Sequence, residues 1–214
     1  MNFKNNCRVL FQGDSITDGN RTRDNDPNHF LGHGYAYIIA ARLGADEPEK
    51  NYEFLNRGVS GNRILDLYGR WQEDTLNLKP DILSILVGVN DIVWELNAKA
   101  EISAEKYEKI YKLLIEEAKE VNSKIIIVIC EPFILPVAGV KDNWNYWFEE
   151  IKKRQEASRK IAKEYNCVFV PLQDEFNNAC ERNKPEYWIW DGVHPTAAGH
   201  ELIARKWIET IISI

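Results

Sequence analysis

Cysteine, excess positive charge and long apolar runs are all scarce in this sequence. Its four cysteines stand far apart, at positions 7, 130, 167 and 180, which excludes a dense disulfide framework and favours a reducing compartment, the cytoplasm. The 33 acidic residues outnumber the 27 basic ones, and the net charge of −6 argues against a nucleic-acid or anionic-membrane partner. No run approaches the roughly 18 apolar residues of a membrane-spanning helix. The first apolar run, Val9–Phe11, is too short for a secretory signal.

The length and composition favour one compact domain. The chain has 214 residues, of which 44% are hydrophobic, and a chain of this size buries enough surface to fold without disulfides or a metal ion. No internal repeat, low-complexity tract or Pro/Gly-rich linker divides it. We therefore predict a single domain over residues 1–214.

Short apolar runs alternate with longer amphipathic segments along the chain. The predicted strands are Arg8–Gln12, Tyr52–Asn56, Ile82–Val87, Lys124–Cys130 and Cys167–Pro171. The predicted helices are Gly34–Leu43, Ile64–Leu78, Ser103–Val121, Asn145–Tyr165 and Ala197–Ile212, the last with Thr196 as a candidate N-cap. The third and fourth strands are almost continuously apolar, which is typical of strands buried on both faces of a parallel sheet. The alternation predicts an α/β fold, a three-layer α/β/α sandwich around a five-stranded parallel sheet.

Glycines and short polar residues follow the first three predicted strands. These exits read Gly13-Asp14-Ser15, Arg57–Asn62 and Gly88–Asp91. Ligands of open parallel sheets bind beyond the carboxyl ends of the strands, so the three exits are the place to look for a site. Ser15 is a possible nucleophile there, provided that a base activates it.

A base for Ser15 is available in the segment Trp190–Pro195. Asp191 stands three residues before His194, close enough to contact one imidazole nitrogen while the other stays free for a serine. The segment follows the last predicted strand and precedes the last helix, and it therefore belongs to the same edge of the sheet. We expect Ser15 and His194 to face each other.

Four sequence blocks together resemble the GDSL, or SGNH, hydrolase family. They are Gly13-Asp14-Ser15, Gly61, the Gly-x-Asn-Asp of 88–91 and the Asp-x-x-His-Pro of 191–195, in the order of the family. They span nearly the whole chain, and the one departure is Ile16, where the namesake motif has leucine. The resemblance implies the flavodoxin-like SGNH hydrolase fold and a serine esterase.

The resemblance also implies a role for each block. Ser15 is implied as the nucleophile, His194 as the base and Asp191 as the acid of a catalytic triad. The backbone N–H groups of Ser15 and Gly61, with the side-chain amide of Asn90, are implied as the oxyanion hole. These residue types suit acyl transfer, because a serine needs a base during attack and the developing oxyanion needs fixed donors.

Within the family, the chain looks most similar to bacterial acetylxylan esterases and related carbohydrate acetylesterases. The likeness rests on Ser60–Asn62, Asp66-Leu67, Arg70–Asp74, Trp190–Pro195 and Ala198–His200. It implies hydrolysis of short-chain acyl esters, above all acetyl esters of carbohydrates such as xylo-oligosaccharides, by a homo-oligomer. Asp14 and Trp190, next to the nucleophile and the acid, are candidate substrate-binding residues.

Two alternatives stay open at this point. The acyl substrate could be another one, as in a lysophospholipase, a thioesterase or an esterase similar to platelet-activating-factor acetylhydrolases. An inactive carbohydrate-binding protein on the same scaffold is the alternative from another class, and the full set of implied catalytic residues argues against it.

Metal and cofactor motifs are weak in this sequence. His29 and His33 form an H-x-x-x-H pair, but glycines at 32 and 34 interrupt any helix there and no third ligand stands at a familiar spacing. Neither G-x-G-x-x-G nor G-x-x-x-x-G-K occurs, so nucleotide binding has no support. We predict no metal and no cofactor.

The seven tryptophans exceed what a core of this size usually needs. Trp71 and Trp207 lie within helix patterns and are predicted to pack in the core. Trp190 is tied by sequence to the predicted active edge. The environment of the other four is left open between core, substrate cleft and subunit interface, since aromatic residues suit all three: Trp94, Trp144, Trp147 and Trp188.

Overall fold

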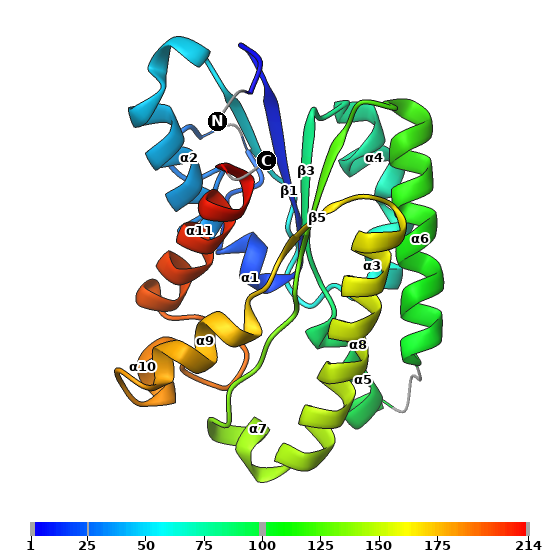
Figure 1. Ribbon diagram of the computed structural model, residues 1–214, viewed down its shortest axis with the longest axis vertical. Coiled ribbons are helices and arrows are strands. Elements are labelled where there is room, and N and C mark those ends of the chain that lie inside the picture. The colour runs from blue at the N-terminus through cyan, green and yellow to red at the C-terminus, as the bar shows by residue number, and fades with distance from the viewer. Residues whose placement is uncertain (1–2, 25, 99–101, 213–214) are drawn as a thin grey trace.

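A five-stranded, wholly parallel sheet forms the centre of the computed structural model (Figure 1), which describes residues 3–24, 26–98 and 102–212, with the backbone alone for 94–98. The strands are β1 (Arg8–Gly13), β2 (Glu53–Asn56), β3 (Ile82–Leu86), β4 (Ile126–Cys130) and β5 (Val168–Val170). Their order is β2-β1-β3-β4-β5, and every neighbouring pair is parallel. This is the strand order of flavodoxin-like folds, so the predicted fold class is confirmed.

Helices cover both faces of the sheet (Figure 1). One face carries α1 (Ser15–Asp18), α2 (Tyr35–Asp46), α9 (Gln173–Cys180), α10 (Pro185–Trp188) and α11 (Ala197–Ile212). The other carries α3 (Ile64–Gly69), α4 (Trp71–Asp74), α5 (Val89–Ala98), α6 (Ala104–Val121) and α8 (Trp144–Glu164). The remaining elements are short: α7 (Ala138–Asp142) and the 3-10 turns Pro48–Lys50 and Leu76–Leu78.

The continuous apolar run of β3 follows from its place between the two helical layers. Ile82 and Leu86 belong to the core on the side of α2 and α11, whereas Leu83 and Ile85 belong to the core on the side of α3 and α6. Successive side chains of a strand point to opposite faces, so a strand covered on both sides needs apolar residues throughout. Ser84 is the polar exception, and its hydroxyl accepts a 3.0 Å hydrogen bond from the indole N–H of Trp207.

The segment predicted as one helix over Ile64–Leu78 is interrupted, and that prediction was wrong in this respect. The chain forms α3, α4 and a 3-10 turn, with Arg70 as the C-cap of α3 and the N-cap of α4. Ile64, Leu67 and Trp71 keep the apolar spacing of a helix and are buried. The buried apolar residues keep helical spacing on both sides of the interruption, which is why the pattern resembled one continuous helix. Helices α1, α5, α7, α9 and α10 were not predicted.

The last helix begins as predicted. The hydroxyl of Thr196 accepts a 3.3 Å hydrogen bond from the backbone N–H of Gly199, as an N-cap side chain does. One turn into α11, His200 is buried, and its Nδ1 accepts a 3.2 Å hydrogen bond from the backbone N–H of Tyr35 at the start of α2. The neutral imidazole thus ties the two helices of this face together.

Trp71 and Trp207 are buried in the core at 1% and 0% exposure, as predicted. Trp147 and Trp188 are also buried, whereas Trp144 is partly buried against Phe148. The side chain of Trp94 lies outside the described residues. Among the residues that the structure describes, no helix combines the length and the apolar character that crossing a membrane requires.

The buried imidazole of His200 predicts a specific dependence of stability on pH. Burial lowers the pKa of His200 from 6.5 to about 4, so between these values the unfolded chain takes up a proton that the folded chain does not. The free energy of unfolding should therefore fall as the pH drops through this window. His200→Gln retains an acceptor for the N–H of Tyr35 but cannot titrate. When the free energy of unfolding is measured with urea at a series of pH values, its slope against pH should be smaller in this variant by up to about 1.4 kcal/mol per pH unit. Equal slopes in the two proteins would contradict this role of His200.

Candidate active site

The exit of β1 carries the predicted nucleophile. Asp14 is the N-cap of α1, its carboxylate accepting a 3.0 Å hydrogen bond from the backbone N–H of Ile16, and Ser15 is the first residue of that helix. Asp14 is 1% exposed, and burial raises its pKa to about 7. This carboxyl group is buried and caps the helix, so a substrate has no access to it in this structure. The expected contact between Asp14 and a substrate does not fit this burial.

Three side chains from distant parts of the sequence form one hydrogen-bonded chain. The hydroxyl of Ser15 lies 2.8 Å from Nε2 of His194. The other ring nitrogen, Nδ1, lies 2.6 Å from Oδ2 of Asp191. With Nδ1 protonated and donating to the carboxylate, Nε2 is an acceptor for the serine proton. The three residues singled out in the sequence are therefore brought together.

The loop Asp191–His194 holds its own geometry. The second carboxylate oxygen of Asp191 accepts the backbone N–H groups of Val193, at 2.9 Å, and His194, at 2.7 Å. Gly192 has φ +97°, and a Cβ there would lie 2.6 Å from a methyl carbon of Val140. Glycine is required at this position on both grounds, the left-handed backbone and the close packing.

The aspartate and the histidine shift each other's acidity. The hydrogen bond with Asp191 is the main reason why the pKa of His194 is raised above 6.5, and the nearby carboxyl of Asp14 adds to the effect. Burial on its own would raise the pKa of Asp191. The hydrogen bonds from the His194 ring and from the loop amides outweigh burial and hold that pKa below its usual value. The pair therefore favours a charged aspartate beside a basic imidazole.

The loop after β2 presents Gly61 at the surface. Gly61 has φ +80°, and a Cβ built on it would meet no heavy atom within 4 Å. Glycine suits this position because the backbone conformation is one that L-residues rarely adopt, whereas the space around Cα is open and would admit a side chain.

Asn90 lies beside this loop, at the start of α5. Its side-chain N–H₂ donates a 3.2 Å hydrogen bond to the backbone carbonyl of Asn62, the residue after Gly61. An amide has two N–H bonds, so one can hold the loop while the other serves a ligand. The predicted oxyanion residues Gly61 and Asn90 thus lie on neighbouring, hydrogen-bonded segments.

Two buried aspartates that the sequence argument did not single out also hold this loop. Oδ2 of Asp18 accepts the backbone N–H of Ser60 at 3.0 Å. Both oxygens of Asp91 face the backbone N–H of Ile64, at 3.3 and 3.4 Å, and burial raises the pKa of Asp91 to about 8. The available signal was their position, Asp91 within the Gly-x-Asn-Asp block and Asp18 three residues after Ser15.

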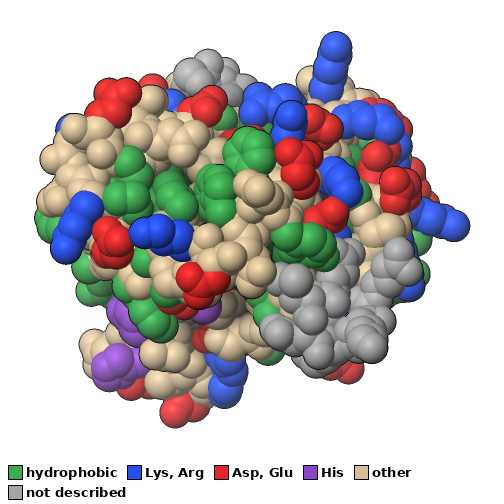
Figure 2. Space-filling model, turned by 90° about the horizontal axis from the view of Figure 1, so that it is seen from below, with side chains coloured by type: hydrophobic (Ala, Val, Ile, Leu, Met, Phe, Trp, Pro, Cys, Tyr) green, Lys and Arg blue, Asp and Glu red, His purple; other side chains and the backbone are tan. Residues whose placement is uncertain are grey.

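Among the described large hydrophobic side chains, Trp190 is the most exposed, at 62% exposure. Its ring lies nearly parallel to the His194 imidazole, with centroids 5.9 Å apart and 20° between the planes. Seen toward the carboxyl ends of the strands, hydrophobic side chains gather beside the histidines (Figure 2). Other exposed aromatic residues of α8 and α10 are Tyr146, Phe148 and Tyr187.

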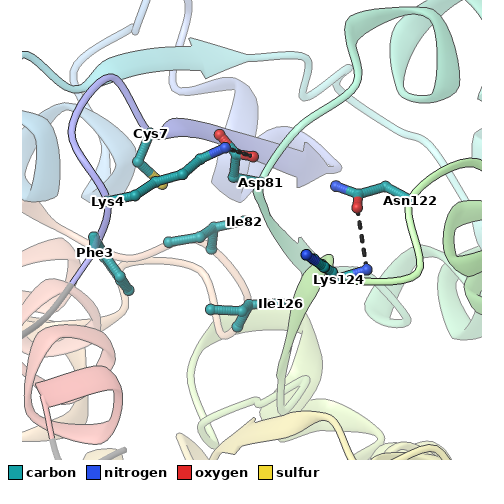
Figure 3. A pocket seen from close by; sticks show the side chains of 8 residues that line it. All are labelled: Phe3, Lys4, Cys7, Asp81, Ile82, Asn122, Lys124 and Ile126. Atoms are coloured by element: carbon teal, nitrogen blue, oxygen red, sulfur yellow. Dashed lines mark hydrogen bonds and ion pairs between the residues drawn. The ribbon is translucent and has the colours of Figure 1, made fainter.

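A cavity of about 240 Å³ lies elsewhere, at the amino ends of the strands (Figure 3). It is lined by Phe3, Lys4, Cys7, Asp81, Ile82, Asn122, Lys124 and Ile126. This is the edge of the sheet opposite Ser15, and the cavity contains none of the predicted site residues. In the described ranges, no group of three His, Cys, Asp or Glu side chains could hold a metal ion.

Comparisons with known proteins identify the family of this chain. A sequence profile of the GDSL-like lipase/acylhydrolase family matches residues 11–202. The acetylxylan esterase of Geobacillus stearothermophilus is 34% identical over 211 residues, which cover 95% of this chain and 93% of that protein.

Solved structures of similar proteins point to the same family. The acetylxylan esterase Axe2 of Geobacillus stearothermophilus superposes with a TM-score of 0.88 at 31% identity, covering 99% of this chain and 96% of that one. A protein of Parabacteroides merdae described as a GDSL-like lipase has a TM-score of 0.94 at 37% identity, with 98% and 97% of the two chains covered.

The raised pKa of His194 predicts the acid limb of the pH profile. A base must be neutral to accept a proton, so kcat/KM for an ester should fall as the pH drops through a midpoint above 6.5. Asp191→Asn removes the main cause of the raised pKa. The midpoint should move to lower pH, while kcat at the plateau falls by up to about 10⁴-fold. A stopped-flow or spectrophotometric pH series with p-nitrophenyl acetate measures both, and an unchanged midpoint in Asp191→Asn would rule out this coupling.

Proposed function

The chain belongs to the GDSL-like lipase/acylhydrolase family and is a carboxylic ester hydrolase, and on that premise we propose that it removes acetyl groups from carbohydrates with Ser15, His194 and Asp191 as its catalytic triad. The observation that carries the proposal is the hydrogen-bonded chain from the Ser15 hydroxyl through His194 to Asp191, with distances of 2.8 and 2.6 Å. The 2.8 Å distance is within reach of proton transfer from Ser15 to His194, and the 2.6 Å hydrogen bond allows Asp191 to orient the ring.

The proposed first half-reaction acylates Ser15. Its oxygen attacks the ester carbonyl while Nε2 of His194 takes the hydroxyl proton, which gives a tetrahedral oxyanion and an imidazolium. The charged Asp191 stabilises that imidazolium and holds the ring in the correct tautomer. The bond from the carbonyl carbon to the leaving oxygen then breaks, and the imidazolium returns the proton to that oxygen, so the free alcohol leaves.

The second half-reaction repeats the same steps with water. Nε2 of His194 takes a proton from water as the water oxygen attacks the acyl carbon. The bond to Ser15 breaks, the serine oxygen recovers its proton from the imidazolium, and the acid is released. In both halves the oxyanion is stabilised by the backbone N–H groups of Ser15 and Gly61 and by the Asn90 amide.

Similarity supports acetylated carbohydrates as the substrate class. The relatives from Geobacillus stearothermophilus are an acetylxylan esterase and Axe2, also described as an acetyl-xylooligosaccharide esterase. Two solved structures of Axe2 are described as catalytic mutants, one with a serine and one with an aspartate replaced by alanine. Trp190, exposed and parallel to the His194 ring, offers a flat apolar surface beside the nucleophile, and we propose it as a substrate-binding residue.

Three broader features are proposals as well. All five described strands lie in one sheet, which supports a single domain over residues 1–214. The cysteines at 7, 130, 167 and 180 are free thiols, which supports a cytoplasmic location. Exposed aromatic residues on α8 and α10, including Phe148 and Tyr187, support a homo-oligomer, and the molar mass in solution tests that assembly.

Two substitutions test the catalytic roles. Ser15→Ala should abolish hydrolysis of p-nitrophenyl acetate, because no other group attacks the carbonyl. Asn90→Ala removes one donor to the oxyanion and should lower kcat by about 10²–10³-fold. Circular dichroism of both variants checks that they are folded. Unchanged turnover in Asn90→Ala would remove that residue from the oxyanion hole.

A chain-length series tests the substrate class. Among p-nitrophenyl esters, acetate should be cleaved with the highest kcat/KM, and acetate should be released from acetylated xylo-oligosaccharides. A preference for octanoate would favour the lysophospholipase or another long-chain alternative. Binding of acetylated oligosaccharides without hydrolysis of any short ester would favour the inactive carbohydrate-binding protein.

A further inference from the structure

Arg70 lies at the break between α3 and α4, and its side chain points toward the carboxyl ends of β1 and β2. The residue is both the C-cap of α3 and the N-cap of α4, with φ −118° and ψ 13°. Its side chain is 17% exposed. The guanidinium is therefore enclosed between the helical layer and the carboxyl edge of the sheet.

The guanidinium donates four hydrogen bonds to four different residues. Nε donates to the side-chain oxygen of Asn62 at 2.7 Å. Nη1 donates to the backbone carbonyl of Arg57 at 2.8 Å and to the carboxylate of Asp74 at 3.0 Å. Nη2 donates to the backbone carbonyl of Gly13 at 3.2 Å.

Three of these acceptors belong to the proposed catalytic edge. Gly13 ends β1 two residues before Ser15, Arg57 follows the last residue of β2, and Asn62 follows Gly61. One rigid cation thus joins the turn of the nucleophile, the end of β2 and the loop of the oxyanion hole. The planar fork of a guanidinium can hold such divergent acceptors at once, and an ammonium cannot.

The two halves of the loop after β2 are held by different groups. Apart from the Arg57 carbonyl, which Arg70 binds, the first half is held by other groups: the N–H of Gly58 donates to the Asn56 side chain, and that of Val59 to the Gly13 carbonyl. The hydrogen bond from Ser60 to Asp18 completes that half. Arg70 acts on the second half through Asn62, whose backbone carbonyl also receives the Asn90 amide.

We propose that Arg70 is a positioning residue that sets the place of the Gly61 N–H relative to the Ser15 nucleophile. The inference rests on the oxyanion hole of the proposed function. Asp74 is its structural counter-ion, since burial lowers the pKa of Arg70 and the Asp74 carboxylate opposes that effect. Arg70 does not touch the substrate; it acts through the loop that does.

Arg70→Lys is the principal test, because it keeps the positive charge and loses the fork. A displacement of the oxyanion donors should lower kcat for p-nitrophenyl acetate by about 10²-fold while KM stays within about threefold. The inhibition constant of methylboronic acid, which forms a tetrahedral adduct on the serine, should rise by a similar factor. Activities are expressed per folded molecule, from circular dichroism. Arg205→Lys is the matched control, because Arg205 pairs with Glu201 on the exposed side of α11.

Asn62→Ala is the second variant, which keeps the inference testable even if Arg70→Lys does not fold. It removes the acceptor in the loop while every charge stays in place, and it should lower kcat by about 10-fold with KM unchanged. If Arg70 acts through Asn62, the effects of Arg70→Lys and Asn62→Ala are not additive in the double variant.

The outcomes separate this inference from the proposed function. Ser15→Ala, measured alongside, must be inactive; activity in that variant would overturn the proposed triad itself. With Ser15→Ala inactive, full kcat per folded molecule in Arg70→Lys and in Asn62→Ala would overturn the positioning role alone. An increase confined to KM would also overturn it, since that result would assign Arg70 to substrate binding. Additive effects or an unchanged boronic acid constant would do the same.

Discussion

The parallel pairing of β1 with β2 and β3 is the constraint on which the rest of the structure depends. Phe11 is opposite Asn56, and Gly13 is opposite Leu86, so three strands end at nearly the same level. Parallel neighbours must be joined by crossover connections, and the residues after each strand therefore come from separate regions of the sequence. The register brings Ser15, Gly61 and Asn90 to one edge although the chain separates them widely.

Buried polar side chains then fix the loops at that edge. Three aspartates accept backbone N–H groups: Asp14 from Ile16, Asp18 from Ser60 and Asp91 from Ile64. Arg70 instead donates to backbone carbonyls. Backbone donors and acceptors that leave the sheet must find partners when they are buried, and here carboxylates satisfy one kind and a guanidinium the other. Burial raises the pKa of Asp14 to about 7 and of Asp91 to about 8, because an enclosed carboxylate loses the stabilisation of water.

Most of the fold followed from the sequence because its signals are local. All five strands were identified, since apolar runs such as Ile82–Val87 are distinctive, and the start of α11 was marked by Thr196. Ser15, Asp191 and His194, which adjoin the ends of predicted strands and helices, are within hydrogen-bond distance as expected, whereas Gly61 and Asn90 were singled out by the family resemblance. The break at Arg70 was missed because its cause is tertiary: the side chain binds groups far away in sequence, and no local pattern encodes that contact. The exposure of Trp190 and the burial of Asp14 depend on packing in the same way.

The loop Asp191–His194 has a consequence for how the site assembles. Asp191 binds the ring and the backbone of His194 and the backbone of Val193, so the aspartate and the histidine form one unit within four residues. This unit packs against α7 and the segment before it: the N–H of Leu135 donates to the Gly192 carbonyl, and Val140 of α7 packs against Gly192. The contact between the carboxylate and the imidazole is therefore local, whereas the contact between Ser15 Oγ and His194 Nε2 joins segments that are far apart in the sequence. A displacement of this loop relative to α7 and the segment before it would accordingly change the distance between Ser15 and His194 and leave the contact between Asp191 and His194 intact.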